Sequence, residues 1–445
     1  MFLPDYVSAC VSRLETAGFP CYAVGGCVRD SLLGLQPQDY DLCTAATPAQ
    51  IQTVFSDHRL ILAGEKHGTV GVLTPGGVVE ITTFRTEGGY GDNRHPDWVR
   101  FVDDITEDLA RRDFTVNAMA YSPTRGLADP FGGANDLKTK TLRAVGDPQT
   151  RFREDSLRIL RGVRFSVRYG LCVEESTEQA MAQLAPLMDN LARERVFDEL
   201  CKLLPLVNAQ DLLRFAPVLT QVIPELAPTV GFNQHSPHHA YDIFTHTAHV
   251  TAAVRADLPL RWAALLHDIG KVPAFTFDEA GRGHFYGHAQ HSAQMADDLL
   301  HRLKAPTALR QRVVQLIDLH MTKLPAEKKT VRRWLGKLGL EALTQLLLLQ
   351  KADTASKGIC KDEELAHFDL LDALLSEILA EDSCLSLRDL QIGGHELMAL
   401  GFSGPAIGKV LEQLLDLVLE ETLPNEKNAL LTAARGMTEY LEVHK

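Results

Sequence analysis

The hydrophobic pattern of this chain changes near Pro148, and the change limits the folds it can adopt. Before Pro148, short apolar runs alternate with turn signals and are interleaved with helical patterns. The strand-like runs are Cys21–Val24, Gly68–Leu73, Val78–Phe84 and Thr115–Tyr121, and the helical patterns are Tyr6–Ala17 and Pro48–Phe55. After Pro148, apolar residues recur at three- and four-residue spacing almost to Lys445, as in helices. We therefore expect an α+β head, in which helices accompany a sheet, followed by an all-α remainder.

Size and composition narrow the class of protein. At 445 residues, the chain has room for roughly three domains. No apolar run approaches the roughly 18 residues of a membrane span, and the N-terminus lacks a signal-peptide pattern. The eight cysteines include no Cys-x-x-Cys pair, which favours reduced thiols over disulfides or a zinc site. We expect a cytoplasmic protein with no membrane contact.

The net charge of −13 bears on nucleic-acid binding. Proteins that coat nucleic acid non-specifically are usually basic, so this class is disfavoured. An RNA partner would have to be recognised by its folded shape, through local basic patches on an acidic body.

A glycine turn precedes two closely spaced carboxylates in the head. The segment GGCVRDSLLG, residues 25–34, supplies Gly26 and Arg29, and Asp39 and Asp41 follow it. Residues two apart on a strand point to one face, so both carboxylates could bind one divalent cation while the turn and Arg29 meet phosphate oxygens. The alternative is a surface turn with two solvated aspartates, because so short a motif often has no function.

Two further head segments carry charges in apolar surroundings. Glu80 lies in the strand-like run VVEITTFR, where a buried unpaired carboxylate would be costly. It could face Asp39 and Asp41 as a third carboxylate, or it could lie on an edge strand and face water. Arg111 and Arg112 begin another apolar segment. They could bind an anion or form a solvated charge cluster.

A charged ladder follows near the start of the helical part. On a helix, Asp155, Arg158, Arg161 and Arg164 recur every three residues, so consecutive members would be neighbours. An acid beside an arginine offers acceptors and donors to the edge of a nucleobase. The alternative is a ladder of weak surface ion pairs. We see no matching acids beyond the first turn, which favours an anionic ligand.

Six potential metal ligands are spread over the helical part, in contexts that include LLHDIGK, FYGH and KADT. Mixed imidazole and carboxylate groups suit one or two divalent ions, either transition metals or Mg²⁺. The alternative is that they serve only as scaffold. The six residues are His246, His267, Asp268, His288, His320 and Asp353.

Together these segments resemble the class II, bacterial-type CCA-adding enzymes, which are tRNA nucleotidyltransferases of the poly(A) polymerase-like family. The resemblance rests on GGCVRDSLLG with DYD, VEITTFRTE, RRDFTVNAMAY, DPFGGANDLK, EDSLRILRGVRF and ERVFDEL. The helical ligands resemble the HD phosphohydrolase superfamily. The implied domains are a polymerase-beta-like nucleotidyltransferase head (1–140), a templating helix and neck (141–228), an HD domain (229–356) and a helical tRNA-binding body and tail (357–445).

The resemblance implies template-independent addition of CCA to tRNA from CTP and ATP, with Mg²⁺ as cofactor and release of pyrophosphate. Asp39, Asp41 and Glu80 would be the catalytic carboxylates, the two aspartates holding Mg²⁺. The nucleotide would be bound by Gly26, Arg29 and Arg112 at its triphosphate and by Asp155 and Arg158 at its base, supported by Arg161 and Arg164. His246, His267, Asp268 and Asp353 would hold one HD metal, and His288 and His320 would complete a second site.

Other segments also match. Residues 86–96 resemble the family's flexible loop, and Lys409 and Lys427 are candidate phosphate contacts in the tail. Three alternatives remain: an enzyme that adds only A, a poly(A) polymerase, and an HD phosphohydrolase with a nucleotide-binding head. The sequence predicts no oligomeric state.

Overall fold

The structure is a computed structural model that describes residues 2–88, 98–236, 240–359, 362–381, 386–420 and 422–437. The chain divides into two compact units. The N-terminal unit runs to Ala227 and includes Arg302–Ala305, and the C-terminal unit comprises Pro228–His301 and the chain from Pro306. All the strands of the large sheet lie in the first unit, and the second is mainly helical, which confirms the predicted fold class.

The N-terminal unit begins with a seven-stranded mixed sheet in the order β3-β4-β5-β2-β1-β8-β9. Strands β2 and β5 are parallel, and the other neighbours are antiparallel. The strands are β1 (Cys21–Val24), β2 (Asp41–Thr44), β3 (Leu60–Ile61), β4 (Thr69–Thr74), β5 (Gly77–Thr83), β8 (Ala120–Ser122) and β9 (Gly126–Ala128).

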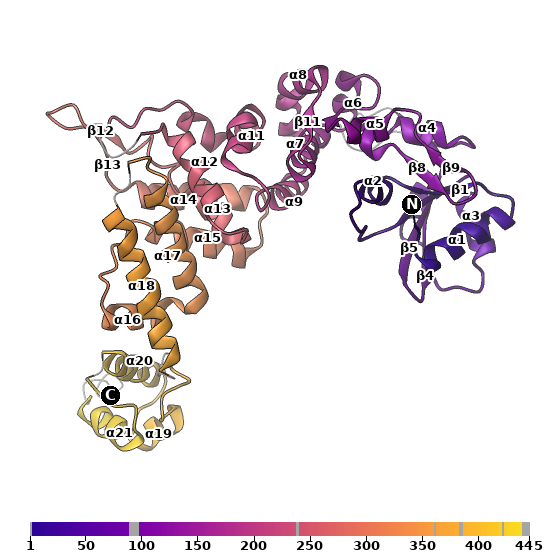
Figure 1. Ribbon diagram of the computed structural model, residues 1–445. Coiled ribbons are helices and arrows are strands. Elements are labelled where there is room, and N and C mark those ends of the chain that lie inside the picture. Colours follow the sequence, from indigo (N-terminus) through magenta and orange to yellow (C-terminus); the bar gives the residue numbers. More distant parts are fainter. Residues whose placement is uncertain are drawn as a thin grey trace. The chain divides into compact units, whose positions relative to one another are not determined.

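Helices cover one face of this sheet. In β5, Val79 and Ile81 are buried while Glu80 between them is exposed, as expected for a strand with one covered face. Helices α1 (Asp5–Thr16) and α3 (Pro48–Val54) pack beside each other against the sheet (Figure 1). Glu80 therefore lies on the opposite face, which α4 (Ile105–Ala110) covers only in part, over Cys43.

The predicted strand Thr115–Tyr121 is wrong in its first half. Residues Thr115–Asn117 form a 3₁₀ turn, η2, and β8 begins only at Ala120. The side-chain amide of Asn117 donates a hydrogen bond to the Asp113 carboxylate at 3.0 Å, and the main-chain N–H of Asn117 donates to the Phe114 carbonyl. Such local side-chain bonds close a turn in competition with the sheet.

Shorter elements complete the head. Strands β6 (Arg85–Gly88) and β7 (Trp98–Phe101) form a hairpin, and residues 89–96 of the predicted flexible loop lie outside the described residues. The head also contains η1 (Glu65–His67) and the helices α2 (Gly26–Leu32), α4 (Ile105–Ala110) and α5 (Gly133–Lys138).

The helices after the head are held to it by a small parallel sheet of β10 (Thr141–Leu142) and β11 (Cys172–Val173). The helix predicted to carry the charged ladder is interrupted: one helix ends at Glu154, Asp155 is extended, and the next begins at Leu157. This part contains α6 (Pro148–Glu154), α7 (Leu157–Tyr169), α8 (Glu175–Leu184), η3 (Ala185–Asn190), α9 (Arg193–Leu203), α10 (Ala209–Arg214), α11 (Ala216–Val222) and η4 (Pro224–Thr229).

The C-terminal unit packs helices around an apolar interior that includes the fully buried Trp262. A hairpin of β12 (Phe275–Phe277) and β13 (Gly283–Phe285) precedes α14. The helices are α12 (Ile243–Ala253), α13 (Leu258–Leu266), α14 (His288–Arg302), α15 (Thr307–Leu319), α16 (Lys328–Leu338), α17 (Leu340–Ala355), α18 (Asp362–Ala380), α19 (Gly394–Ala399), α20 (Pro405–Leu419) and α21 (Lys427–Gly436).

The last three helices gather around their own apolar cluster near the C-terminal end of the chain (Figure 1). There the Lys427 ammonium pairs with Glu396 at 3.0 Å, while Lys409 is exposed on α20. Across the described residues, every helix is too short or too polar to span a membrane.

Candidate functional sites

The three head carboxylates lie on or beside the face of the sheet opposite α1 and α3. Asp41 begins β2 and is the register partner of Glu80 on the parallel strand β5, and Asp39 lies two residues before the strand. All three are exposed. Because β5 lies between β4 and β2, the alternative that Glu80 occupies an edge strand is wrong.

The electrostatics of these carboxylates favour a cation. Although Asp41 is exposed, the protein atoms around it partly desolvate the carboxylate, and this desolvation and the negative charge of Glu80 raise its pKa, against the opposing effect of Arg112. A divalent cation would relieve this repulsion, so the donor set suits Mg²⁺, which prefers carboxylate oxygens. In the described part of the head, no three such carboxylate oxygens lie within 4.8 Å of one another, so the site is more open than the histidine cluster of the C-terminal unit.

The glycine turn connects β1 to α2 and brings Arg29 and Arg112 to the same place. Gly25 has a φ of 72°, and a Cβ added there would lie 2.7 Å from Nη1 of Arg112, so a side chain cannot be accommodated without movement. Arg29 is buried: its Nη1 donates to Oδ1 of Asn117 at 2.5 Å, and its guanidinium lies 4.3 Å from the Tyr169 ring centre. The two arginines therefore lie beside a backbone turn.

A cavity of about 480 Å³ opens beside this turn. Eight arginines and three aspartates are among its lining residues, and guanidinium groups are good partners for phosphate. The charged residues are Arg29, Asp41, Arg111, Arg112, Asp113, Asp155, Arg158, Arg161, Arg164, Arg168 and Arg195. Such a lining suits a polyanion, and it joins the sequence-predicted arginines to Asp41 and Asp155 in one space.

The expected side-by-side arrangement of Asp155 and Arg158 on one helix is wrong, because the helix breaks at Asp155. The Asp155 carboxylate accepts instead from Arg195 of α9, at 2.8 and 3.3 Å. Arg158 donates to Glu154 at 2.7 Å and to the carbonyl of Arg111 at 2.9 Å. Both residues still line the cavity.

The arginines of α7 pair with carboxylates from other segments of the chain, so the expectation that their charges are unmatched is wrong. Arg161 donates twice to Oδ2 of Asp113, at 2.9 and 2.6 Å. Nε of Arg164 donates to Glu199 at 2.6 Å, and both side chains are buried. Burial alone would raise the pKa of Asp113, but the Arg161 charge and hydrogen bonds from Asn117 and Arg161 lower it to about 2.

Sequence reasoning missed Asp113, Asn117, Arg195 and Glu199 as parts of this site. All four lie in RRDFTVNAMAY and ERVFDEL, two of the segments that carry the family resemblance. The four-residue spacing of Arg195 and Glu199 places them one turn apart on a helix, which was the available signal.

The C-terminal unit brings its six predicted ligands together. The closest pair of side chains joins Nε2 of His246 to Asp353 at 2.9 Å. Asp268 lies 3.2 Å from Nε2 of His267 and 3.4 Å from Nε2 of His288. Two groups have all their ligand atoms within 4.8 Å of one another: His246, His267 and Asp268, and Asp268, His288 and His320. Asp268 belongs to both.

Each histidine of this cluster is oriented by the main chain. The Nδ1 atoms lie 2.6–3.2 Å from the carbonyl oxygens of Ser356, Ala264, Phe285 and Ile317. A hydrogen bond from Nδ1 leaves the lone pair on Nε2, the usual arrangement in metal-binding histidines. Burial lowers the pKa of His320 to about 4, which keeps its ring neutral. These donors suit one or two divalent metal ions.

Lys271 is a charged neighbour that sequence reasoning missed. Its Nζ lies 2.7 Å from Oδ2 of Asp268 and donates to Gln234 at 2.9 Å. Burial disfavours ionisation of Asp268, but the neighbouring His267 imidazole and the Lys271 charge hold its pKa well below the usual range. Asp268 is therefore a carboxylate ready to bind cations. The sequence HDIGK indicates this pairing, because it places Lys271 three residues after Asp268.

Comparison with known families gives three matches in chain order. Residues 21–143 match the poly A polymerase head domain, 170–229 match the probable RNA and SrmB-binding site of polymerase A, and 243–373 match the HD domain. The HD match includes the histidine cluster, and the head match includes the part of the arginine-lined cavity that lies between Gly25 and Asn117.

Similar proteins cover the whole chain. A CCA-adding enzyme from Latilactobacillus sakei is 35% identical over 98% of this chain and 99% of its own length. One from Bacillus velezensis is 32% identical over 94% of each. The crystal structure of the Bacillus stearothermophilus CCA-adding enzyme in complex with CTP superposes with a TM-score of 0.73 at 26% identity, covering 98% of both chains. The chain belongs to the family of CCA-adding enzymes, the tRNA nucleotidyltransferases.

Proposed function

We propose that the N-terminal unit adds C, C and A to the 3′ end of tRNA, using CTP and ATP and releasing pyrophosphate, without a nucleic-acid template. The observation that carries this proposal is the single cavity that joins Asp41, the arginines of α7 and Asp155. It combines groups for a triphosphate with groups for a base edge. The substrate tRNA would place the reaction in the cytoplasm.

The residues divide into three roles. Asp39, Asp41 and Glu80 would hold Mg²⁺. Bound there, it would neutralise triphosphate charge and favour deprotonation of the attacking 3′-hydroxyl of tRNA. Arg29 and Arg112, with the main chain at Gly26, would fix the triphosphate.

Asp155 and Arg158 would recognise the base. Oδ1 of Asp155 accepts from Arg195 and from the main-chain N–H of Leu157, whereas Oδ2 accepts only from Arg195, so Oδ2 keeps a second lone pair for a base amino group. Arg158 uses three hydrogen bonds within the described residues, and a guanidinium has five N–H donors. Arg161 and Arg164 would support this site through their acid partners.

The test uses tRNAs that lack CCA, CA or A, each incubated with CTP, ATP or both, followed by sequencing of the products. Complete CCA ends are expected, and products extended by A alone would contradict the proposal. Asp41→Ala should reduce incorporation by more than about 100-fold while leaving tRNA binding nearly unchanged. Asp103→Ala, which removes another exposed head carboxylate, is the matched control.

We also propose a second activity: metal-dependent hydrolysis of a small phosphate ester in the C-terminal unit. The four inward-facing Nε2 atoms around Asp268 support it. A divalent ion bound there would activate water for attack on phosphorus. Asp268→Asn should remove both bound metal, measured by mass spectrometry, and hydrolysis of a small phosphodiester, while the exposed Asp318→Asn should keep both. Equal rates in all three proteins would show that the cluster is only scaffold.

A further inference from the structure

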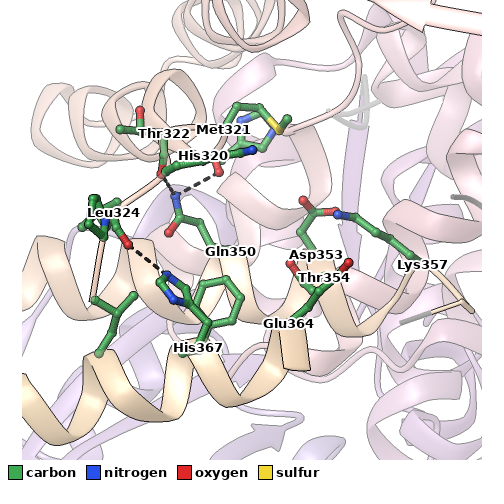
Figure 2. Close-up of a pocket in the computed structure, with 14 residues that line it drawn as sticks. His320, Met321, Thr322, Leu324, Gln350, Asp353, Thr354, Lys357, Glu364 and His367 are labelled. Atoms are coloured by element: carbon green, nitrogen blue, oxygen red, sulfur yellow. Dashed lines mark hydrogen bonds between the residues drawn. The ribbon is translucent and has the colours of Figure 1, made fainter. Parts of the chain in front are cut away.

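A second cavity in the C-terminal unit adjoins the histidine cluster. It has a volume of about 600 Å³ and lies among α17, α18 and the segment 320–325 (Figure 2). His320 and Asp353 of the cluster line it directly. A volume of this size accommodates a small organic molecule and far exceeds what a phosphate ion needs.

The walls of this cavity are fixed by hydrogen bonds within the protein. The Gln350 amide donates to the carbonyls of His320 at 3.0 Å and Thr322 at 2.8 Å. At the other end of the segment, Nε2 of His367 lies 2.9 Å from the Leu324 carbonyl. Figure 2 shows these three hydrogen bonds. The cavity is therefore formed before any ligand binds, as small-molecule sites usually are.

One side of the cavity is suited to phosphate. Asp353 and Lys357 lie together on this side (Figure 2), and the Lys357 ammonium brings a positive charge to it. Lys357 and Asp353 also line a smaller cavity of about 230 Å³, which reaches Asp268 and His288. The two cavities therefore meet at the proposed metal centre, with a lysine at the junction.

The other side is apolar. Leu324, Pro325, Phe368 and Leu371 give the cavity an apolar lining, and Leu324 lies away from Lys357 (Figure 2). Leu324 and Leu371 are buried members of an apolar cluster, and the partly buried Phe368 packs against it. A phosphate ester whose organic group is small and polar would leave this surface unused, whereas a flat ring would cover it and could stack on Phe368.

We propose that this cavity holds the aromatic ring of a phosphate ester while its phosphate reaches the histidine cluster. The inference rests on the proposed hydrolase function and specifies its substrate class. In the reaction, a water oxygen forms a bond to phosphorus, the bond from phosphorus to the ring-bearing oxygen breaks, and a proton from water passes to that oxygen.

The test compares phenyl phosphate, methyl phosphate and inorganic phosphate as ligands of the full-length, metal-loaded protein by calorimetry. Burial of the ring should make phenyl phosphate bind about tenfold more tightly than methyl phosphate. Phe368→Ala should reduce this ratio to about twofold without changing metal content or methyl phosphate binding. Leu370→Ala, an exposed apolar residue on the same helix, is the matched control and should keep the ratio.

Two outcomes separate this inference from the function on which it rests. If metal and inorganic phosphate bind but phenyl and methyl phosphate bind equally, the ring site is wrong and the hydrolase proposal stands. If neither metal nor phosphate binds, both fail. Saturation-transfer NMR on the unmutated protein needs no variant: transfer to the phenyl ring protons is expected, and its absence in a bound ester would overturn the ring site.

Discussion

Arg164 offers a quantitative test of how the arginines are held. Its Nε lies 2.6 Å from Oε2 of Glu199, and the two side chains are only 8% and 5% exposed. Arg164→Met would keep much of the apolar volume but leave a buried carboxylate without its main partner. Breaking a buried pair in this way costs about 3–5 kcal/mol. Lys202, at 3.7 Å and 60% exposed, offsets at most about 1 kcal/mol, so we expect a loss of about 3 kcal/mol.

Amide hydrogen exchange measures this loss locally, without requiring the whole chain to unfold in one step. A loss of about 3 kcal/mol should raise exchange in peptides from α7 and α9 by roughly 150-fold. Arg168→Met on the same helix, where the side chain is exposed, should change exchange by less than about threefold.

The double variant Arg164→Met/Glu199→Leu also removes the buried carboxylate that the single variant leaves without its main partner. Because an apolar replacement of a buried ion pair is often neutral or stabilising, it should recover most of the lost protection. The reasoning fails if Arg164→Met leaves exchange within about threefold of the unmutated protein, or if the double variant is as unprotected as the single one.

Three further predictions concern other residues. The ionised Asp113 stabilises the fold above pH about 4 and loses this effect as the pH falls towards its folded pKa of about 2. The difference in unfolding free energy between the unmutated protein and Asp113→Asn, measured by urea denaturation, should therefore shrink by about 2 kcal/mol between pH 5 and 2. Gly25→Ala places a Cβ at positive φ and 2.7 Å from Nη1 of Arg112; steady-state kinetics should show a higher KM for CTP, with unchanged metal content in the C-terminal unit. Gly270→Ala places a Cβ 2.7 Å from the carbonyl oxygen of His288; mass spectrometry should show reduced metal content while CCA addition continues.

The sequence was most informative where local pattern determines geometry. Alternating burial places Glu80 on the exposed side of its strand, and the parallel register then brings it beside Asp41. The six HD residues likewise come together as their sequence contexts indicated.

It was least informative about partners that are distant in the chain. Arg161 lies 48 residues from Asp113, and Arg164 lies 35 residues from Glu199. The helical spacing of the arginines does not indicate which distant carboxylates they pair with. The break at Asp155 was hidden for a similar reason, because the helical periodicity continues across it. The carbonyls that orient the histidines are main-chain groups, which every residue has and no sequence pattern distinguishes.

The paired arginines also have an evolutionary consequence. Each pair joins segments far apart in the chain. A substitution at one member leaves the other charge without its main partner, and a second substitution at that other residue removes the cost. Drift at these positions should therefore occur in two steps, through an intermediate of low stability, and the two residues should vary together among relatives. The couplings expected are Asp113 with Arg161, Asp155 with Arg195, and Arg164 with Glu199.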